Sequence, residues 1–148
     1  MIVAQVPDKN IPEVFARVKH LLEKALDRGL EEFHIEDIFA SILKKDQQLW
    51  VALDEETGDM PMAFTTQIMY YPHATHLGLL LTGSEPHTIK KWIDEWQEPV
   101  ENFCRINGVS HMITFGRVGW EKFLDRKGFN KYYAVMSKEI KNEKPASD

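Results

Sequence analysis

The stretch at residues 116–140, "GRVGWEKFLDRKGFNKYYAVMSKEI", predicts a short helix that ends at Gly-Phe and is followed by a strand. Trp120, Phe123 and Leu124 are spaced i, i+3 and i+4, which places them on one face of a helix. Gly128 is suited to the left-handed conformation that ends a helix. The residues after it are rich in aromatic and β-branched types, which favour a strand. We therefore expect the chain to end in a helix-strand unit that needs a partner from the preceding sequence.

The preceding sequence predicts alternating strands and helices. Apolar residues alternate in the expected strands and recur at three- and four-residue intervals in the expected helices. A proline inside a helix removes a hydrogen bond, so we expect Pro99 to kink or split its helix. The expected elements are a strand at residues 2–6, helices at 11–25 and 35–43, a hairpin over 48–72, a strand at 74–83, a helix at 89–106 and a strand at 111–116. This β-α-α-β-β-β-α-β-α-β order predicts an α/β fold, in which helices cover both faces of a mixed sheet.

The composition limits the class of protein. A chain of 148 residues is the size of one domain, which we place at residues 1–140 with a frayed tail at 141–148. The net charge of −5 opposes nonspecific binding to nucleic acid, which depends on Lys and Arg neutralising phosphates. Cys104 is the single cysteine, so no intramolecular disulfide forms. The sequence shows no signal peptide and no membrane-spanning run, and we expect a cytoplasmic protein without a membrane partner.

The order of elements, together with "FLDRKGF" at residues 123–129, resembles the GCN5-related N-acetyltransferases, the GNAT superfamily. The resemblance implies a site for acetyl-CoA where the strand at 74–83 splays from the strand at 111–116. In this family, backbone groups of the first strand pair with the pantetheine arm, and amides of the next turn bind the pyrophosphate. The residues that the resemblance places at the cofactor are Leu80, Leu81, Thr82, Ser84, His87, Thr88 and Arg117.

The sequence departs from the family pattern at two places. The turn "GSEPHTIKKW" has no glycine between Gly83 and Gly108, and Glu85 would repel a phosphate. Leu124 stands where the family often has a tyrosine that protonates the departing thiolate, and Arg117 stands where an asparagine is common. Both departures are similar to the degenerate GNAT-like proteins of short-tailed bacteriophages, some of which are internal virion proteins.

Three residues are candidates for proton transfer. Tyr132 and Tyr133 of the expected last strand are potential general acids, although neighbours on a strand point to opposite faces and at most one faces the site. His76 lies on the strand that carries the catalytic base in the family, and an imidazole accepts a proton from an amine directly or through water. The alternative for all three is an ordinary place on a sheet surface. The spacing of His73, His87, His111 and Cys104 does not predict a metal site.

Two functions remain open from the sequence. The first is an acyl-CoA-dependent N-acyltransferase, in which a backbone N–H near residues 80–82 holds the oxyanion and the acceptor is an amine of unknown identity. The second is a catalytically degenerate binding or structural module that contacts a protein partner through its hairpin at residues 60–71, in the host cytoplasm or the virion of a phage. Formation of a homo-oligomer is left open.

Overall fold

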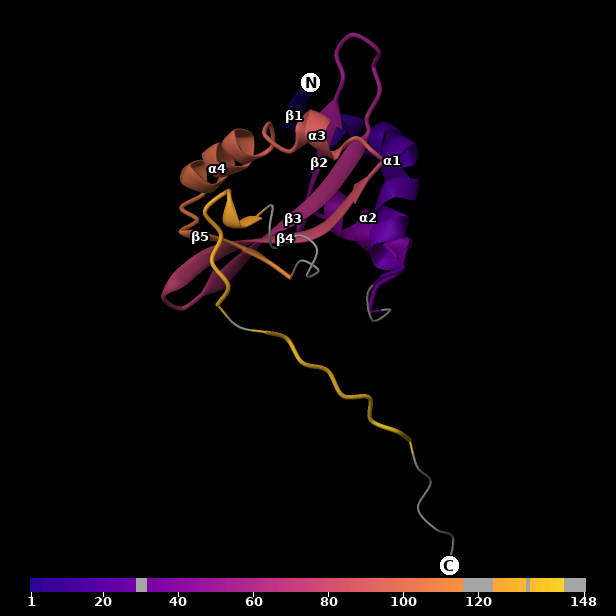
Figure 1. Cartoon of the computed structure of the whole chain (residues 1–148). Helices are drawn as coiled ribbons and strands as arrows, with labels where there is room; N and C mark the ends of the chain where they lie inside the picture. Colours follow the sequence, from indigo (N-terminus) through magenta and orange to yellow (C-terminus); the bar gives the residue numbers. More distant parts are fainter. Residues whose placement is uncertain (29–31, 116–123, 133, 143–148) are drawn as a thin grey trace, which may run out of the picture. The chain divides into compact units, whose positions relative to one another are not determined.

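The structure is a computed structural model that describes residues 1–28, 32–115, 124–132 and 134–142. The chain falls into two compact units, Met1–Thr114 and Phe115–Asp148, so the expectation of one domain over residues 1–140 stays a prediction. Figure 1 shows the helices and strands of the first unit. They are, in chain order, β1 (Ile2–Gln5), the short 3-10 helix η1 (Asp8–Asn10), α1 (Ile11–Leu26), α2 (Ile35–Leu43), β2 (Gln48–Leu53), β3 (Met62–Tyr71), β4 (Ala74–Ser84), α3 (Ile89–Trp92), α4 (Gln97–Ile106) and β5 (His111–Thr114).

The strands form one mixed sheet in the order β1-β2-β3-β4-β5. The first three pairings are antiparallel, and β4 pairs with β5 in parallel. A parallel pair needs a crossover connection, which α3 and α4 supply here. The predicted α/β class and mixed sheet are confirmed.

Helices α1 and α2 cover one face of the sheet (Figure 1). α1 presents an apolar stripe because its buried residues are spaced by three and four positions. Phe15 of α1 stacks on Phe39 of α2 with ring centroids 4.5 Å apart, which joins the two helices. The shared core under this face consists of Val6, Ile11, Phe15, Val18, Leu21, Leu22, Ile35, Ile38, Ile42, Leu49, Val51 and Ala63.

Helix α4 lies on the opposite face of the sheet from α1 and α2 (Figure 1). Trp50 of β2 anchors this layer, because its ring stacks on Phe64 at 5.6 Å and meets Phe103 of α4 edge-on at 5.5 Å. The Trp50 Nε1–H donates a hydrogen bond to Thr66 Oγ1 at 2.9 Å, and that hydroxyl donates to Gln48 Oε1 at 2.8 Å. The one polar atom of the indole is therefore satisfied inside the sheet.

The helix expected at residues 89–106 is split, as Pro99 predicted, but the break lies earlier than the proline. α3 ends at Trp92 and α4 begins at Gln97, so Pro99 occupies the first turn of the second helix. A proline ring clashes with the carbonyl of the residue four positions earlier, here Glu95, so a continuous helix fails before the proline. In the first turn, the N–H that proline lacks has no partner within the helix.

The described part of the second unit confirms the helix end and contradicts the last strand. Leu124 and Asp125 are helical, and Gly128 has a φ of 87°. The Phe129 N–H donates to the Leu124 carbonyl at 3.2 Å, and the Gly128 N–H donates to the Asp125 carbonyl at 3.3 Å, which is a Schellman motif. Trp120 and Phe123 lie outside the described residues.

The prediction of a strand after Phe129 is wrong for the residues that the structure describes. Residues 129–132 and 134–142 form no strand, whereas the five strands of the sheet all lie within Met1–Thr114. Strand preference measures how well side chains fit a pleated, half-buried surface, and a strand forms only where another strand supplies its hydrogen bonds. Most of the tail expected at residues 141–148 lies outside the described residues.

Candidate functional site

The pairing of β4 with β5 stops in the middle of β4. The parallel register runs from His76 opposite His111 to Leu79 opposite Thr114, which confirms that these strands are parallel neighbours. β4 continues to Ser84, so its last five residues have no register partner among the described residues of β5. A strand edge without a partner presents backbone N–H and C=O groups in a row. This edge is the place where the sequence predicted a bound acyl-pantetheine arm.

A β-bulge lies at the point where the β4–β5 pairing ends. On the β3 side, Thr65 is opposite Leu81 and Thr66 is opposite Leu79, which leaves Leu80 as the extra residue. A bulge interrupts the regular ladder and bends the strand. The bulge in β4 therefore directly follows the last residue paired with β5, where the predicted splay would begin.

The bulge distinguishes among the three amides predicted to hold an oxyanion. The Leu81 N–H donates to the hydroxyl of the buried Thr65 at 3.3 Å, so this amide already has an acceptor. Leu80 is the bulged residue and has no register partner on β3 or β5. Leu80 is therefore the first candidate for an oxyanion donor. The sequence did not indicate this role of Thr65, because the hydroxyl of a strand threonine has no local motif.

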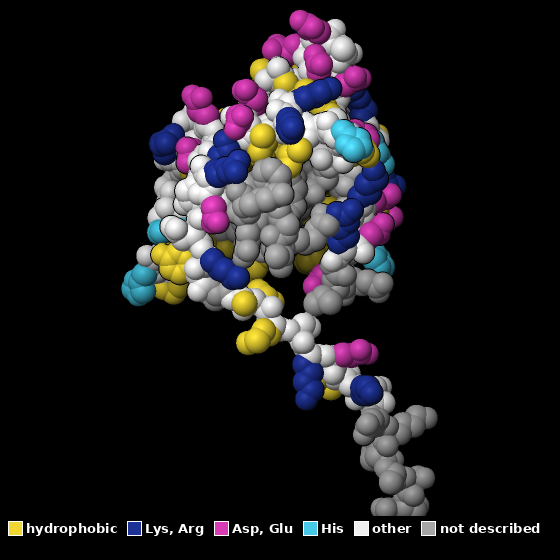
Figure 2. Space-filling model, in the orientation of Figure 1, with side chains coloured by type: hydrophobic (Ala, Val, Ile, Leu, Met, Phe, Trp, Pro, Cys, Tyr) yellow, Lys and Arg dark blue, Asp and Glu magenta, His cyan; other side chains and the backbone are white. Residues whose placement is uncertain are grey.

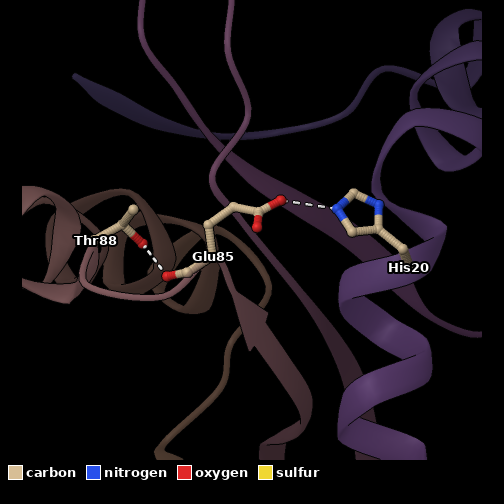
Figure 3. Close-up of polar contacts among 3 residues, drawn as sticks. All are labelled: His20, Glu85 and Thr88. Atoms are coloured by element: carbon tan, nitrogen blue, oxygen red, sulfur yellow. Dashed lines mark hydrogen bonds and ion pairs between the residues drawn. The ribbon is translucent and has the colours of Figure 1, made fainter.

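The turn after β4 contains few donors that a phosphate could use (Figure 3). The Glu85 N–H donates to the Pro61 carbonyl at 2.7 Å, and Pro86 has no N–H. The Thr88 hydroxyl donates to the Glu85 carbonyl at 2.7 Å. Ser84, which the resemblance places at the cofactor, is the last residue of β4, and Thr88 is the residue before α3. The helix begins later because Pro86 and a positive φ of 62° at His87 prolong the turn.

The side chain of Glu85 is held by α1. Its Oε1 lies 2.8 Å from Nε2 of His20, and both side chains are about half exposed (Figure 3). The carboxylate predicted to repel a phosphate is thus fixed at the end of β4 by a polar contact. His20 was not predicted as a site residue, because its spacing within the helix is that of an ordinary solvent-facing position.

The structure places His76 in the paired part of β4 and away from the bulge. Its ring lies 5.2 Å from that of Tyr71 and 5.4 Å from that of His111, between centroids. Leu80 is four positions after His76 along the strand, which corresponds to about 13 Å. A direct proton transfer at Leu80 is therefore too far for His76, and its role as a base through water stays a prediction.

The other predicted site residues belong to the second unit or lie outside the described chain. Tyr132 is described and 79% exposed, whereas Tyr133 and Arg117 lie outside the described residues. The proposed roles of these three residues stay predictions. Within the described ranges, no group of His, Cys, Asp and Glu side chains could hold a metal ion.

An open depression between α4 and β5 was not predicted from the sequence. Its volume is about 280 Å³, and Cys104 lies in its wall. Burial raises the pKa of the Cys104 thiol, Glu101 adds to the rise and Arg105 opposes it. The thiol therefore stays protonated at neutral pH and is a poor nucleophile. The depression is lined by Glu101, Cys104, Arg105, Val109, Ser110, His111 and Met112.

Comparison with known proteins identifies the fold. No family model and no curated protein matches the sequence. A solved structure described as a probable acetyltransferase is similar to this chain with a TM-score of 0.72 and 13% identity, over 97% of this chain and 100% of that one. An aminoglycoside acetyltransferase from an uncultured soil metagenomic sample matches with a TM-score of 0.67 and 12% identity, over 94% and 95%.

A third similar structure is the glucosamine-6-phosphate N-acetyltransferase from Arabidopsis thaliana, with a TM-score of 0.66 and 14% identity over 94% of this chain and 97% of that one. At such identities the likeness establishes the arrangement of elements and leaves the substrate open. The chain has the fold of the GCN5-related N-acetyltransferase superfamily.

Proposed function

We propose that this protein transfers an acyl group from a thioester to an amine. The observation that carries the proposal is the bulge at Leu80, which coincides with the end of the β4–β5 pairing. The coincidence leaves a row of backbone groups for an amide-containing pantetheine arm and one amide for the thioester carbonyl. The fold of the acetyltransferases supports the same reaction class.

The proposed reaction requires few groups from the protein. The amine nitrogen attacks the carbonyl carbon of the thioester, the Leu80 N–H stabilises the oxyanion, and the carbon–sulfur bond then breaks. The proton lost by the amine goes to water or to His76 through water, and the thiolate takes up a proton from Tyr132, Tyr133 or solvent. The acceptor amine remains unidentified. Acetyl-CoA is the donor that the fold family implies, and the fit of its diphosphate part is treated below.

The experiment replaces Leu80 in two ways. Leu80→Pro removes the N–H, whereas Leu80→Ala keeps it and is the matched control. We expect transfer from millimolar S-acetylpantetheine or acetyl-CoA to a panel of amines, measured by thiol release and by product mass, to fall about 100-fold in Leu80→Pro and to change little in Leu80→Ala. Circular dichroism of both variants verifies the fold. Equal activity of two folded variants contradicts the role of this amide, and no transfer by the unmodified protein contradicts the proposed function.

A binding or structural module is the second candidate, and the turn at Glu85 favours it. The fixed carboxylate and the occupied donors oppose tight binding of a diphosphate. A ligand stabilises a protein by about 2.7 kcal/mol at a hundred times its dissociation constant, which is a melting shift of several degrees for a domain of this size. The module predicts a shift below about one degree with millimolar acetyl-CoA, together with no transfer from any thioester.

The protein partner of such a module would contact exposed aromatic side chains. Of the segment at residues 60–71 predicted as a contact surface, the part paired with β2 is buried, and Tyr70 and Tyr71 at the tip of the β3–β4 hairpin are exposed. Figure 2 shows apolar side chains beside histidines at this tip. A cytoplasmic or virion location and a phage origin belong to this second candidate as proposals.

A further inference from the structure

The pantetheine arm and the nucleotide diphosphate of an acyl-CoA molecule need different groups from the protein. A pantetheine arm is uncharged and contains two amides, so it pairs with the backbone groups of a strand edge as a peptide strand does. The nucleotide end carries a diphosphate, which needs free N–H donors or cations. The part of β4 from Leu80 to Ser84 is suited to the first requirement, and the turn that follows must meet the second.

The turn meets the requirement of the diphosphate only in part. Two donors of the turn are occupied, since the Glu85 N–H donates to the Pro61 carbonyl and the Thr88 hydroxyl donates to the Glu85 carbonyl, and Pro86 has no N–H. The helix that follows has only four residues, so it supplies little positive potential at its first turn. Lys90 and Lys91 are the second and third residues of this one-turn helix, so they are the cations nearest to the turn in the sequence.

Glu85 adds a negative charge at the same place. Its Oε1 is held by His20, and with 42% of the side chain exposed the carboxylate keeps contact with solvent. A phosphate brought next to it suffers like-charge repulsion, which screening by salt weakens. The contact with α1 also prevents the side chain from rotating away without loss of a hydrogen bond.

We propose that the acyl donor is a thioester on a pantetheine arm that carries no nucleotide diphosphate at this turn. This inference rests on the proposed acyltransferase function and specifies its donor. The donor is either a free pantetheine thioester or a phosphopantetheine thioester on a carrier protein, since both present the same arm. In the reaction the new carbon–nitrogen bond replaces the carbon–sulfur bond, the amine loses one proton, and the pantetheine thiolate gains one.

The test measures binding and therefore does not depend on the acceptor amine. Calorimetric titrations at low ionic strength compare S-acetylpantetheine with acetyl-CoA for the unmodified protein, for Glu85→Gln and for Glu55→Gln. The last variant is the control, because it removes an equal charge from the exposed tip of the β2–β3 hairpin. We expect S-acetylpantetheine to bind the unmodified protein at least as tightly as acetyl-CoA. Glu85→Gln should strengthen acetyl-CoA binding about three- to tenfold and leave S-acetylpantetheine unchanged.

The outcomes separate this inference from the function on which it rests. Binding of acetyl-CoA that is tenfold or more tighter than that of S-acetylpantetheine overturns the inference and leaves the acyltransferase intact. No binding of either thioester overturns both. An equal effect of Glu85→Gln and Glu55→Gln also contradicts the local role of Glu85. A further titration with an acetylated phosphopantetheinyl carrier protein distinguishes the two sources, since tighter binding than that of S-acetylpantetheine assigns the protein-borne donor.

Discussion

Gly83 lies where the backbone of α1 comes closest to β4. A Cβ atom at this position would overlap the carbonyl oxygen and carbonyl carbon of Leu21, which are backbone atoms that move only with the helix. A Cβ atom at Gly78 would instead overlap the end of the Met69 side chain, which is flexible. The two glycines of one strand are therefore retained for different reasons, and the sequence does not distinguish them.

We expect Gly83→Ala to lower the free energy of unfolding by about 2 kcal/mol or more, because added atoms in a tightly packed place force a backbone shift. Gly78→Ala is the matched control and should cost less than about 1 kcal/mol, since Met69 can adopt another rotamer. Urea denaturation of both variants measures the difference. Equal midpoints for the two variants would show that α1 does not press on β4 at Gly83.

The residues of the site illustrate the limit of sequence analysis at this scale. Leu80, Leu81 and Thr82 were predicted as a group, because the resemblance to the GNAT superfamily places this part of the strand at the cofactor. The particular role of Leu80 depends on a bulge, and a one-residue offset between strands leaves no mark in a run of leucines. The His20–Glu85 contact joins residues 65 positions apart, and such a pair cannot be predicted from either local pattern.

At the scale of elements, local signals predicted most bounds well. Apolar spacing predicted α1 and α2, and the strands of the sheet were found near their expected residues. The structure differs from these predictions where the bounds of an element depend on contacts beyond its own local sequence. The break between α3 and α4 depends on the clash of Pro99 with the carbonyl four positions earlier. A strand after Phe129 depends on a second strand that pairs with it.

The helix end at Gly128 gives a prediction for the second unit. Gly128→Val should lower the free energy of unfolding by more than about 1 kcal/mol, because a β-branched residue resists the positive φ of 87° found there. Gly128→Asn is the control, since asparagine tolerates this conformation and should cost less. Chemical denaturation compares the two variants. An unchanged midpoint for Gly128→Val would mean that this cap does not contribute to stability.

At the scale of the whole molecule, the charge distribution limits the partners. Acidic side chains gather at the tip of the β2–β3 hairpin (Figure 2), where Glu55, Glu56 and Asp59 are exposed. With a net charge of −5, the protein should give no change in the fluorescence anisotropy of labelled duplex DNA at 150 mM salt. DNA binding that weakens steeply as the salt concentration increases would indicate a local basic patch, which the net charge of the whole chain does not show. Within the described residues, no helix could cross a membrane.

The extra residue in β4 also determines how many residues this strand must contain. Side chains of a strand alternate between faces, and cross-strand partners share a face. Leu79 is therefore on the layer of Thr66 and Trp50, whereas Leu81, although also odd-numbered, is packed against the core under α1 and α2. Deleting Leu80 would exchange the layers of every later residue of β4 and place a side chain at the position of Gly83 against Leu21. The length of this segment is therefore fixed to the residue, so that insertions and deletions in related sequences should fall in the loops on either side and not between Leu79 and Gly83.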